Sequence, residues 1–237
     1  MKTTAARRLT ICRDGLRAAW PICLGYTPVG LAFGVLARKA GLAPWQVGLL
    51  SAVVFAGSSQ FIAVAMLQAG AGIASIVATT FAVNLRHALM SSSMAMPLAG
   101  AGRRFLALFA YGLTDESFAL NSSLFRERAG WDRYRALVLH HAANLAWIAA
   151  TVAGACAGQF VPPGALGIDY ALTGMFLCLL VFQLRSRVHV LAAALGGTSA
   201  LVFYLAWPGN AYALLGAVFG ATAAAAAERL FRPRRRP

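Results

Sequence analysis

Three polar side chains, Asn84, Arg86 and His87, occur close together in an otherwise apolar segment. A charged side chain at the centre of a lipid bilayer costs roughly 3 kcal/mol or more. It therefore persists where it is paired, lines a water-filled cavity or binds a ligand. These residues predict a substrate or ion site. The alternative is that Arg86 extends its side chain to the membrane interface and only orients its helix.

Two acidic residues, Asp115 and Glu116, follow in the next apolar segment, within the sequence LTDESFAL. If they lie at membrane depth, they are the plausible partners of Arg86. The other interpretation is that Thr114 caps a helix whose first turn contains both acids, where the helix dipole favours negative charge. The residue types alone leave both interpretations open.

Further polar residues occur before and after these two groups. Gln60 follows two serines in the middle of an apolar run, so it requires a hydrogen-bonding partner or water. His140, His141 and Asn144 occur at the start of a later apolar segment. For these histidines we favour a helix end near the lipid headgroups.

The composition is that of an integral membrane protein. The chain has 237 residues, of which 59% are hydrophobic and 12% charged, with a mean hydropathy of +0.67. Soluble domains have about 25% charged residues. Residues 40–85 contain no charged residue or histidine, and a membrane span needs about 20 apolar residues. The apolar runs are continuous rather than alternating, which predicts α-helices and excludes a β-barrel.

We therefore expect an all-α, polytopic helical membrane protein with six to eight transmembrane segments. Residues 18–227 form its transport domain, between a basic cytoplasmic arm at 1–17 and a basic cytoplasmic tail at 228–237. The net charge of +14 comes from Lys and Arg in the termini and short loops. This distribution follows the positive-inside rule and does not indicate nucleic-acid binding.

The sequence does not predict an enzyme, a cofactor or a metal site. It contains no HExxH or GxSxG motif, and its four cysteines are scattered without the close spacing of metal or redox motifs.

The first apolar segment, residues 20–36, contains Pro21, Gly25, Pro28 and Gly30, so we expect it to be broken or kinked. Backbone freed at such a break holds substrate in many transporters. The alternative is a packing kink, aided by Gly30 and Gly34 at the spacing of close helix contacts. Similar pairs are Gly154/Gly158 and Gly216/Gly220. The other expected segments are 47–69, 73–98, 105–125, 136–159, 170–184, 188–207 and 210–227.

The number of crossings depends on residues 20–36 and 105–125. If both segments cross, there are eight spans and Arg38, Lys39, Arg103 and Arg104 lie outside. If both are re-entrant, there are six spans and all four residues lie inside, as the charge rule favours. Eight spans would instead give two oppositely oriented units, 18–98 and 104–184. Both termini are expected in the cytoplasm.

Four blocks of sequence, in this order, resemble the AzlC family of branched-chain amino acid permeases. They are GYTPVGLAFGVLARKAGL, LLSAVVFAGSSQFIAVAML, TTFAVNLRHALMSSSMAMPL and LTDESFAL. The resemblance covers about residues 18–120 closely. It implies a bacterial inner-membrane protein, with relatives that export leucine, isoleucine, valine or methionine. It also implies a partner, a small hydrophobic subunit of the AzlD type.

We therefore expect a secondary transporter that exports an apolar amino acid, driven by an ion gradient such as protons. Arg86, or free N–H groups at residues 28–30, would bind the carboxylate. Asp115 or Glu116 would bind the ammonium group, and His87 would couple proton movement or be a polar residue satisfied by a carbonyl. The predicted site residues are Pro28, Gly30, Gln60, Asn84, Arg86, His87, Asp115 and Glu116, with a pocket of Phe33, Phe55, Phe61 and Phe81. The alternatives are a channel or transporter for another metabolite and a non-transporting membrane subunit.

Overall fold

The computed structural model describes residues 4–160 and 187–206, together with single residues and short pieces between 174 and 226. All regular structure in this part of the chain is helical, which confirms the predicted fold class. The helices are α1 (Thr4–Lys39), α2 (Pro44–Val53), α3 (Gly57–Gln68), α4 (Ile73–Ser93), α5 (Arg103–Tyr111), α6 (Asp115–Glu127), α7 (Arg133–Ala157), the short 3-10 helix η1 (Gly158–Phe160) and α9 (Arg187–Ala206).

The described helices fall into two length classes. Four are long and apolar enough to cross a membrane, namely α1, α4, α7 with η1, and α9. By contrast, α2, α3, α5 and α6 contain 9 to 13 residues. At about 1.5 Å per residue they are roughly 14–20 Å long, whereas the hydrocarbon core is about 30 Å thick. The short helices therefore reach the middle of a membrane without crossing it.

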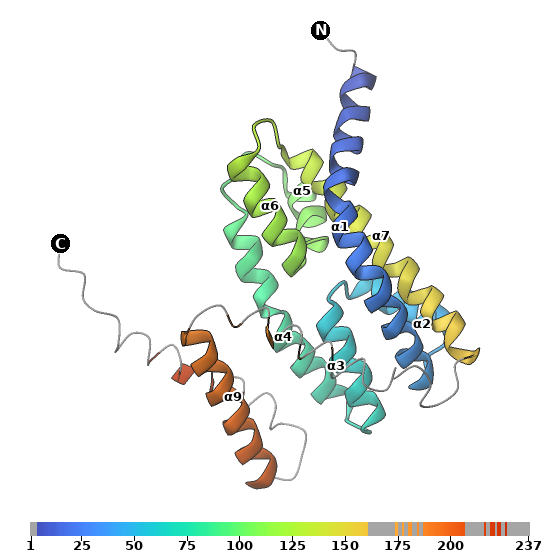
Figure 1. Ribbon diagram of the computed structural model, residues 1–237, viewed down its shortest axis with the longest axis vertical. Helices are drawn as coiled ribbons and strands as arrows, with labels where there is room; N and C mark the ends of the chain where they lie inside the picture. Colours follow the sequence, from blue (N-terminus) through green and yellow to red (C-terminus); the bar gives the residue numbers. More distant parts are fainter. Residues whose placement is uncertain are drawn as a thin grey trace, which may run out of the picture.

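α1 and α7 form the central scaffold and run side by side in the same direction (Figure 1). Arg135 at the start of α7 donates a hydrogen bond of 3.0 Å to Asp14. Further along, a Cβ atom on Gly34 would collide with the carbonyl oxygen of Thr151, and one on Gly154 with that of Leu31. The small residues thus let the two backbones touch, which confirms the role predicted for the glycine pairs of these two helices.

Residues 20–36 were expected to be broken or kinked, and the expected break is wrong. α1 is one helix of 36 residues with Pro21 and Pro28 inside it. Gly30 faces Ala150 of α7, where an added Cβ atom would lie 2.7 Å from the alanine Cβ. Glycine at this position permits helix contact, and packing against α7 makes the prolines tolerable within the helix.

The predicted single span 47–69 is also wrong, because the chain folds there into a hairpin, α2–α3. α2 runs opposite to α7, with Gly48 beside Val152. The helix is interrupted at residues 54–56, where the N–H of Ala56 donates to the carbonyl oxygen of Val54 at 2.9 Å. α3 then returns along α1, and the rings of Phe33 and Phe61 lie 5.0 Å apart.

A second hairpin, α5–α6, enters from the opposite end of the scaffold. α5 lies alongside α7, with the ring of Phe109 4.3 Å from that of His140. α6 starts at Asp115 and runs back in the opposite direction. The re-entrant alternative for residues 105–125 is therefore the one that the structure favours. The tips of the two hairpins meet, since the Tyr111 hydroxyl donates to the carbonyl oxygen of Ala52 (Figure 1).

The remaining predicted segments agree with the structure where it describes them. α7 corresponds to 136–159 and α9 to 188–207, while α4 starts at the predicted residue 73 and ends at Ser93, before the predicted 98. Gly216 and Gly220 would collide with Ala200 and Gly196 of α9 if they carried a Cβ atom, as their spacing predicted. The segments predicted at 170–184 and 210–227 lie largely outside the described residues.

Candidate functional site

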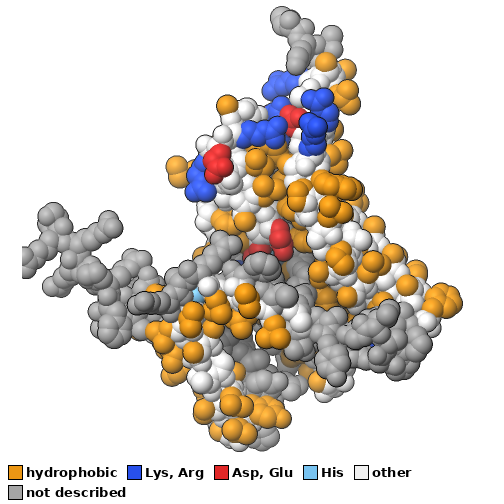
Figure 2. All heavy atoms as spheres, in the orientation of Figure 1, with side chains coloured by type: hydrophobic (Ala, Val, Ile, Leu, Met, Phe, Trp, Pro, Cys, Tyr) orange, Lys and Arg blue, Asp and Glu red, His pale blue; other side chains and the backbone are white. Residues whose placement is uncertain are grey.

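A cavity of about 370 Å³ lies where the tips of the two hairpins meet α1, α4 and α7. Apolar groups from α1 and the first hairpin form much of its wall, including Val29 and Phe55, with Trp147 from α7. Figure 2 shows acidic side chains in the middle of this face of the molecule, well away from the basic cluster near the start of α1. The polar side chains of the lining are Tyr26, Ser58, Arg86, His87, Thr114, Asp115 and Glu116.

Arg86 connects the two hairpins from its position on α4. Its Nη2 donates a hydrogen bond of 2.6 Å to the hydroxyl of Ser58, at the start of α3. Its Nη1 lies 2.8 Å from Oδ2 of Asp115, at the start of α6. Asp115 is thus the partner of Arg86, and snorkelling to the membrane interface does not describe this side chain.

The start of α6 has a side-chain cap at Thr114, and its Asp115 also forms an ion pair with Arg86. The two interpretations of this segment, a helix cap and a partner for Arg86, are therefore both correct. The hydroxyl of Thr114 accepts the backbone N–H of Ser117, and the hydroxyl of Ser117 accepts that of Thr114 at 2.8 Å. The Tyr26 hydroxyl lies 2.8 Å from Thr114 Oγ1 and donates to Glu116 at 2.7 Å. The first turn of α6 therefore presents its carboxylates to the cavity in fixed positions.

The start of α3, unlike that of α6, has neither a side-chain cap nor an acidic residue in its first turn. Its N-cap residue, Ala56, provides no side-chain cap, and Ala56, Gly57 and Ser58 all line the cavity. The first N–H groups of a helix have no partner within the helix, and the helix dipole is positive at this end. α3 therefore presents a site for negative charge to the cavity.

Gln60 and Asn84 lie behind the lining rather than in it. Gln60 is fully buried. Its Oε1 accepts the indole N–H of Trp147 at 2.8 Å, and its Nε2 donates to Ser51 at 3.1 Å. Asn84 accepts a hydrogen bond from Ser59. Gln60 has the partner it requires and orients Trp147, which does line the cavity.

Pro28 and Gly30 do not line the cavity. Free N–H groups at a helix break occur in the structure at the start of α3 and not at residues 28–30, because α1 is continuous. This corrects the predicted position of the backbone site.

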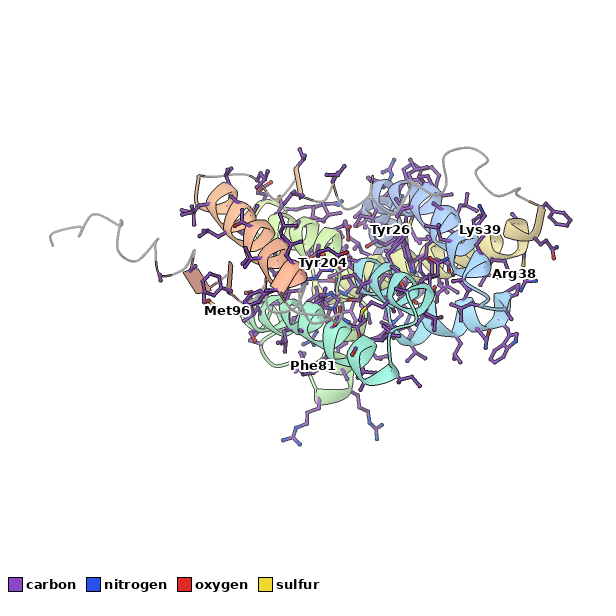
Figure 3. All side chains as sticks on the ribbon, turned by 90° about the horizontal axis from the view of Figure 1, so that it is seen from below. Tyr26, Arg38, Lys39, Phe81, Met96 and Tyr204 are labelled. Atoms are coloured by element: carbon purple, nitrogen blue, oxygen red, sulfur yellow. The ribbon has the colours of Figure 1, made fainter. Side chains whose placement is uncertain are left out.

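Of the four phenylalanines predicted to form a pocket, one lines the cavity. Phe55 lines the cavity. Phe33 and Phe61 are buried beside each other in the core behind it. Phe81 is 67% exposed and lies at the outer edge of the bundle, whereas Tyr26 lies among the helices (Figure 3). Phe81 was misplaced because an apolar face on α4 suits a lipid-facing surface as well as a pocket.

His140 is fully buried among the helices. Its Nδ1 bonds the carbonyl oxygen of Phe109 at 3.1 Å, so this nitrogen carries the proton. Its Nε2 then accepts the amide of Asn121 at 2.9 Å, and the Asn121 oxygen accepts the indole N–H of Trp131. A neutral His140 thus holds the second hairpin against α7.

Sequence reasoning missed Tyr26, Ser58 and Trp147 as members of the lining. Two of them gave a usable signal. Tyr26 precedes Pro28 in the first block of the family resemblance, and the indole N–H of Trp147 needs an acceptor in an apolar segment. Gln60 was an obvious acceptor for it.

Comparison with known proteins shows to which family the chain belongs. A family model described as "AzlC protein" matches residues 21–161. This chain belongs to the AzlC family. The AzlC match runs from α1 through η1 and includes every residue that lines the cavity.

Curated relatives cover most of this AzlC-family chain. An uncharacterized membrane protein of Archaeoglobus fulgidus is 36% identical over 81% of the chain and 84% of its own length. The inner membrane protein YgaZ of Escherichia coli is 30% identical over 81% and 80%. The branched-chain amino acid transport protein AzlC of Bacillus subtilis is 28% identical over 71% and 66%. No solved structure matches the chain significantly.

Proposed function

We propose that this chain is a secondary transporter that exports branched-chain amino acids across the bacterial inner membrane, driven by an ion gradient. Leucine, isoleucine, valine and methionine are the substrates to test. The observation that carries the proposal is the cavity itself. Two half-length helices begin there from opposite ends of the scaffold, one with free N–H groups and one with two carboxylates. The name of the Bacillus subtilis relative supports this substrate class.

The cavity matches the three parts of an apolar amino acid. Arg86 and the N–H groups at the start of α3 bind the carboxylate. Asp115 or Glu116 binds the ammonium group, and the apolar wall near Val29 and Phe55 receives the side chain. His87 also lines the cavity, where it is placed to exchange a proton during the cycle.

The positive-inside rule gives this arrangement an orientation. Basic residues lie near the starts of α1, α5 and α7. These starts are at the same end of the scaffold, since Arg135 bonds Asp14 of α1 and Arg133 lies over the ring of Phe105 in α5. With that end in the cytoplasm, the N-terminus is inside, α5–α6 enters from the cytoplasm and α2–α3 from outside. Arg38 and Lys39 then lie outside and Arg103 and Arg104 inside. Each hairpin is thus positioned to separate the cavity from one side of the membrane.

The proposal includes a small hydrophobic subunit of the AzlD type as a partner. It is tested in cells fed dipeptides that release labelled leucine, isoleucine, valine or methionine. Cells express this chain alone or with the subunit, and retention of each amino acid is measured. Faster loss of one amino acid only with both proteins supports an export pair and names the substrate. No difference for any of the four, with both proteins in the membrane, contradicts amino-acid export.

The same assay tests Arg86. We expect Arg86→Gln to reduce export to the level of cells without the protein, because the variant loses the positive charge that faces the cavity. Arg104→Gln, outside the cavity lining, is the matched control. Full export by Arg86→Gln at normal membrane levels would show that Arg86 has no central role.

A further inference from the structure

The two carboxylates at the start of α6 have different partners, although they are neighbours in sequence. Asp115 forms an ion pair with Arg86, with 2.8 Å between Oδ2 and Nη1. Glu116 accepts a 2.7 Å hydrogen bond from the hydroxyl of Tyr26, which is a neutral donor. Among the residues that the structure describes, no ion pair includes Glu116. Within this part of the chain, the negative charge of Asp115 is compensated by a cation and that of Glu116 is not.

This difference gives the cavity an unbalanced charge. Among the residues that the structure describes, the charged side chains of the lining are Arg86, Asp115 and Glu116, and with His87 neutral one negative charge has no cationic counterpart there. Carboxylates at membrane depth are costly unless a cation or a proton compensates them. The cavity is therefore suited to a ligand that brings one positive group with it.

Glu116 is also held in a fixed orientation. The hydroxyl of Thr114 accepts the N–H of Ser117 and is 2.8 Å from the Tyr26 hydroxyl, which in turn donates to Oε2 of Glu116. The described residues show no hydrogen bond to the other oxygen, Oε1. Such a chain of hydroxyl groups orients a carboxylate while leaving one oxygen open to a donor.

The surroundings of Glu116 suit a primary ammonium group. The ring of Tyr26 packs edge-on against Trp147, with centroids 5.4 Å apart, and against Phe55 at 6.3 Å. All three aromatic residues line the cavity. An ammonium group carries three donors, and aromatic faces add a favourable interaction with a cation.

We infer that Glu116, and not Asp115, binds the ammonium group of the substrate, with Tyr26 as its positioning residue. Asp115 instead positions Arg86, which binds the carboxylate. This inference rests on the proposed function and sharpens its substrate class. The site accepts apolar solutes that carry an ammonium group next to a carboxylate, and it discriminates against the corresponding 2-hydroxy acids.

The test uses the purified full chain in liposomes of phosphatidylethanolamine and phosphatidylglycerol. The three probes are leucine, its 2-hydroxy analogue 2-hydroxy-4-methylpentanoate, which lacks the ammonium group, and 3-methylbutylamine, which lacks the carboxylate. Binding of each is measured for the wild type, Glu116→Gln and Asp115→Asn. Glu127→Gln is the matched control, because Glu127 lies at the far end of the same helix and is exposed.

We expect the wild type and Glu127→Gln to bind leucine at least about tenfold more tightly than the 2-hydroxy acid, since a hydrogen bond to a charged group is lost. In Glu116→Gln the affinities for leucine and 3-methylbutylamine fall roughly ten- to hundredfold, and affinity for the 2-hydroxy acid stays within about twofold. In Asp115→Asn the affinities for leucine and for the 2-hydroxy acid fall by similar factors, so that the preference for leucine is retained.

Two results overturn the inference while leaving the proposed function intact. One is a Glu116→Gln variant that still prefers leucine as the wild type does, and the other is loss of that preference only in Asp115→Asn. If Glu116→Gln does not fold, Glu116→Asp replaces it, because it retracts the charge by one methylene group. An unchanged preference in Glu116→Asp then counts against the inference. A wild type that binds none of leucine, isoleucine, valine and methionine, either alone or reconstituted with the small subunit, contradicts both the inference and the proposed function.

Discussion

The two hairpins share one feature away from the cavity, a buried amide that accepts an indole N–H, and they differ where their second helices start at the cavity. In α2–α3 a buried amide, Gln60, accepts the indole N–H of Trp147, and in α5–α6 the buried Asn121 accepts that of Trp131. At the cavity, α3 begins at Ala56 without a side-chain cap. α6 begins at Thr114 with a capping box and two acids in its first turn.

This difference separates the parts of the hairpins that hold them in place from the parts that face a ligand. Gln60 anchors the first hairpin to α7 through Trp147, and Asn121 anchors the second through His140. The two helix starts give the cavity a positive and a negative side. A zwitterion offers one group to each side. The following changes test whether anchoring and recognition are separate, beginning with the largest expected effect.

Asn121→Leu removes the anchor of the second hairpin. It leaves the indole of Trp131 and Nε2 of His140 unpaired, and both residues are buried. We expect a loss of about 2–4 kcal/mol in unfolding free energy, because each unpaired buried group costs about 1–3 kcal/mol. Thermal unfolding measures this loss. The folded fraction should keep the wild-type order of amino-acid affinities, and a changed order would show that anchoring and recognition are not separate.

The glycines at the two tips should differ in their tolerance of alanine. A Cβ atom on Gly112 would lie 2.6 Å from Cβ of His140, whereas one on Gly57 would lie 3.2 Å from the ring edge of Trp147. Since a Cβ atom cannot move without its backbone, we expect Gly112→Ala to cost about 2 kcal/mol and Gly57→Ala about 1 kcal/mol or less. Gly112 has φ −85°, which alanine adopts freely, so the difference is steric. Equal unfolding temperatures for the two variants would contradict this.

Ala56→Ser makes the start of α3 resemble that of α6, because it places a hydroxyl group at the N-cap. A serine N-cap stabilises a helix by about 1 kcal/mol relative to alanine. Its hydroxyl also occupies an N–H group that we assign to the substrate carboxylate. We therefore expect a higher unfolding temperature together with a roughly three- to tenfold weaker affinity for leucine. Ala63→Ser, further along α3, serves as the control for the added hydroxyl, and unchanged affinity in Ala56→Ser would count against the carboxylate site at α3.

Tyr26→Phe should have the smallest effect. It removes one hydroxyl donor from Glu116 and leaves the ring contacts with Trp147 and Phe55. We expect leucine affinity to fall about two- to fivefold, with little change for the 2-hydroxy acid, because a partly exposed hydrogen bond contributes about 0.5–1 kcal/mol. Tyr134→Phe, outside the cavity lining, is the matched control. A larger effect on the 2-hydroxy acid than on leucine would contradict the role given to Tyr26.

The sequence was sufficient for the parts of the fold that depend on composition and local pattern. Long apolar segments identified α4, α7 and α9, and a cap at Thr114, which is the start of α6, was one of the two interpretations of that segment. Arg86 needed an anion, and the two acids of the next segment were its evident partners. These features follow from the cost of unpaired charge at membrane depth.

The position of the helix break in the first part of the chain was harder to predict, because tertiary contacts decide where a helix is interrupted. The prolines of α1 suggested a break, yet contact with α7 keeps that helix continuous. The chain instead breaks in α2–α3, between Val53 and Gly57, where the local sequence contains no proline. That break depends on residues distant in sequence, such as Trp147, which bonds Gln60. Local pattern cannot supply such contacts.

The lengths of the hairpin helices have a consequence for biosynthesis. α2, α3, α5 and α6 are each too short to be inserted as a span. α7, which packs against α2, α5 and α6 and bonds Gln60 of α3 through Trp147, is made after all four. We therefore expect residues 44–68 to remain accessible at the membrane surface until α7 is in place. Cysteine labelling of ribosome-bound chains that end before or after residue 157 would measure this. The order in which the chain emerges would then make α7 the element that completes the cavity.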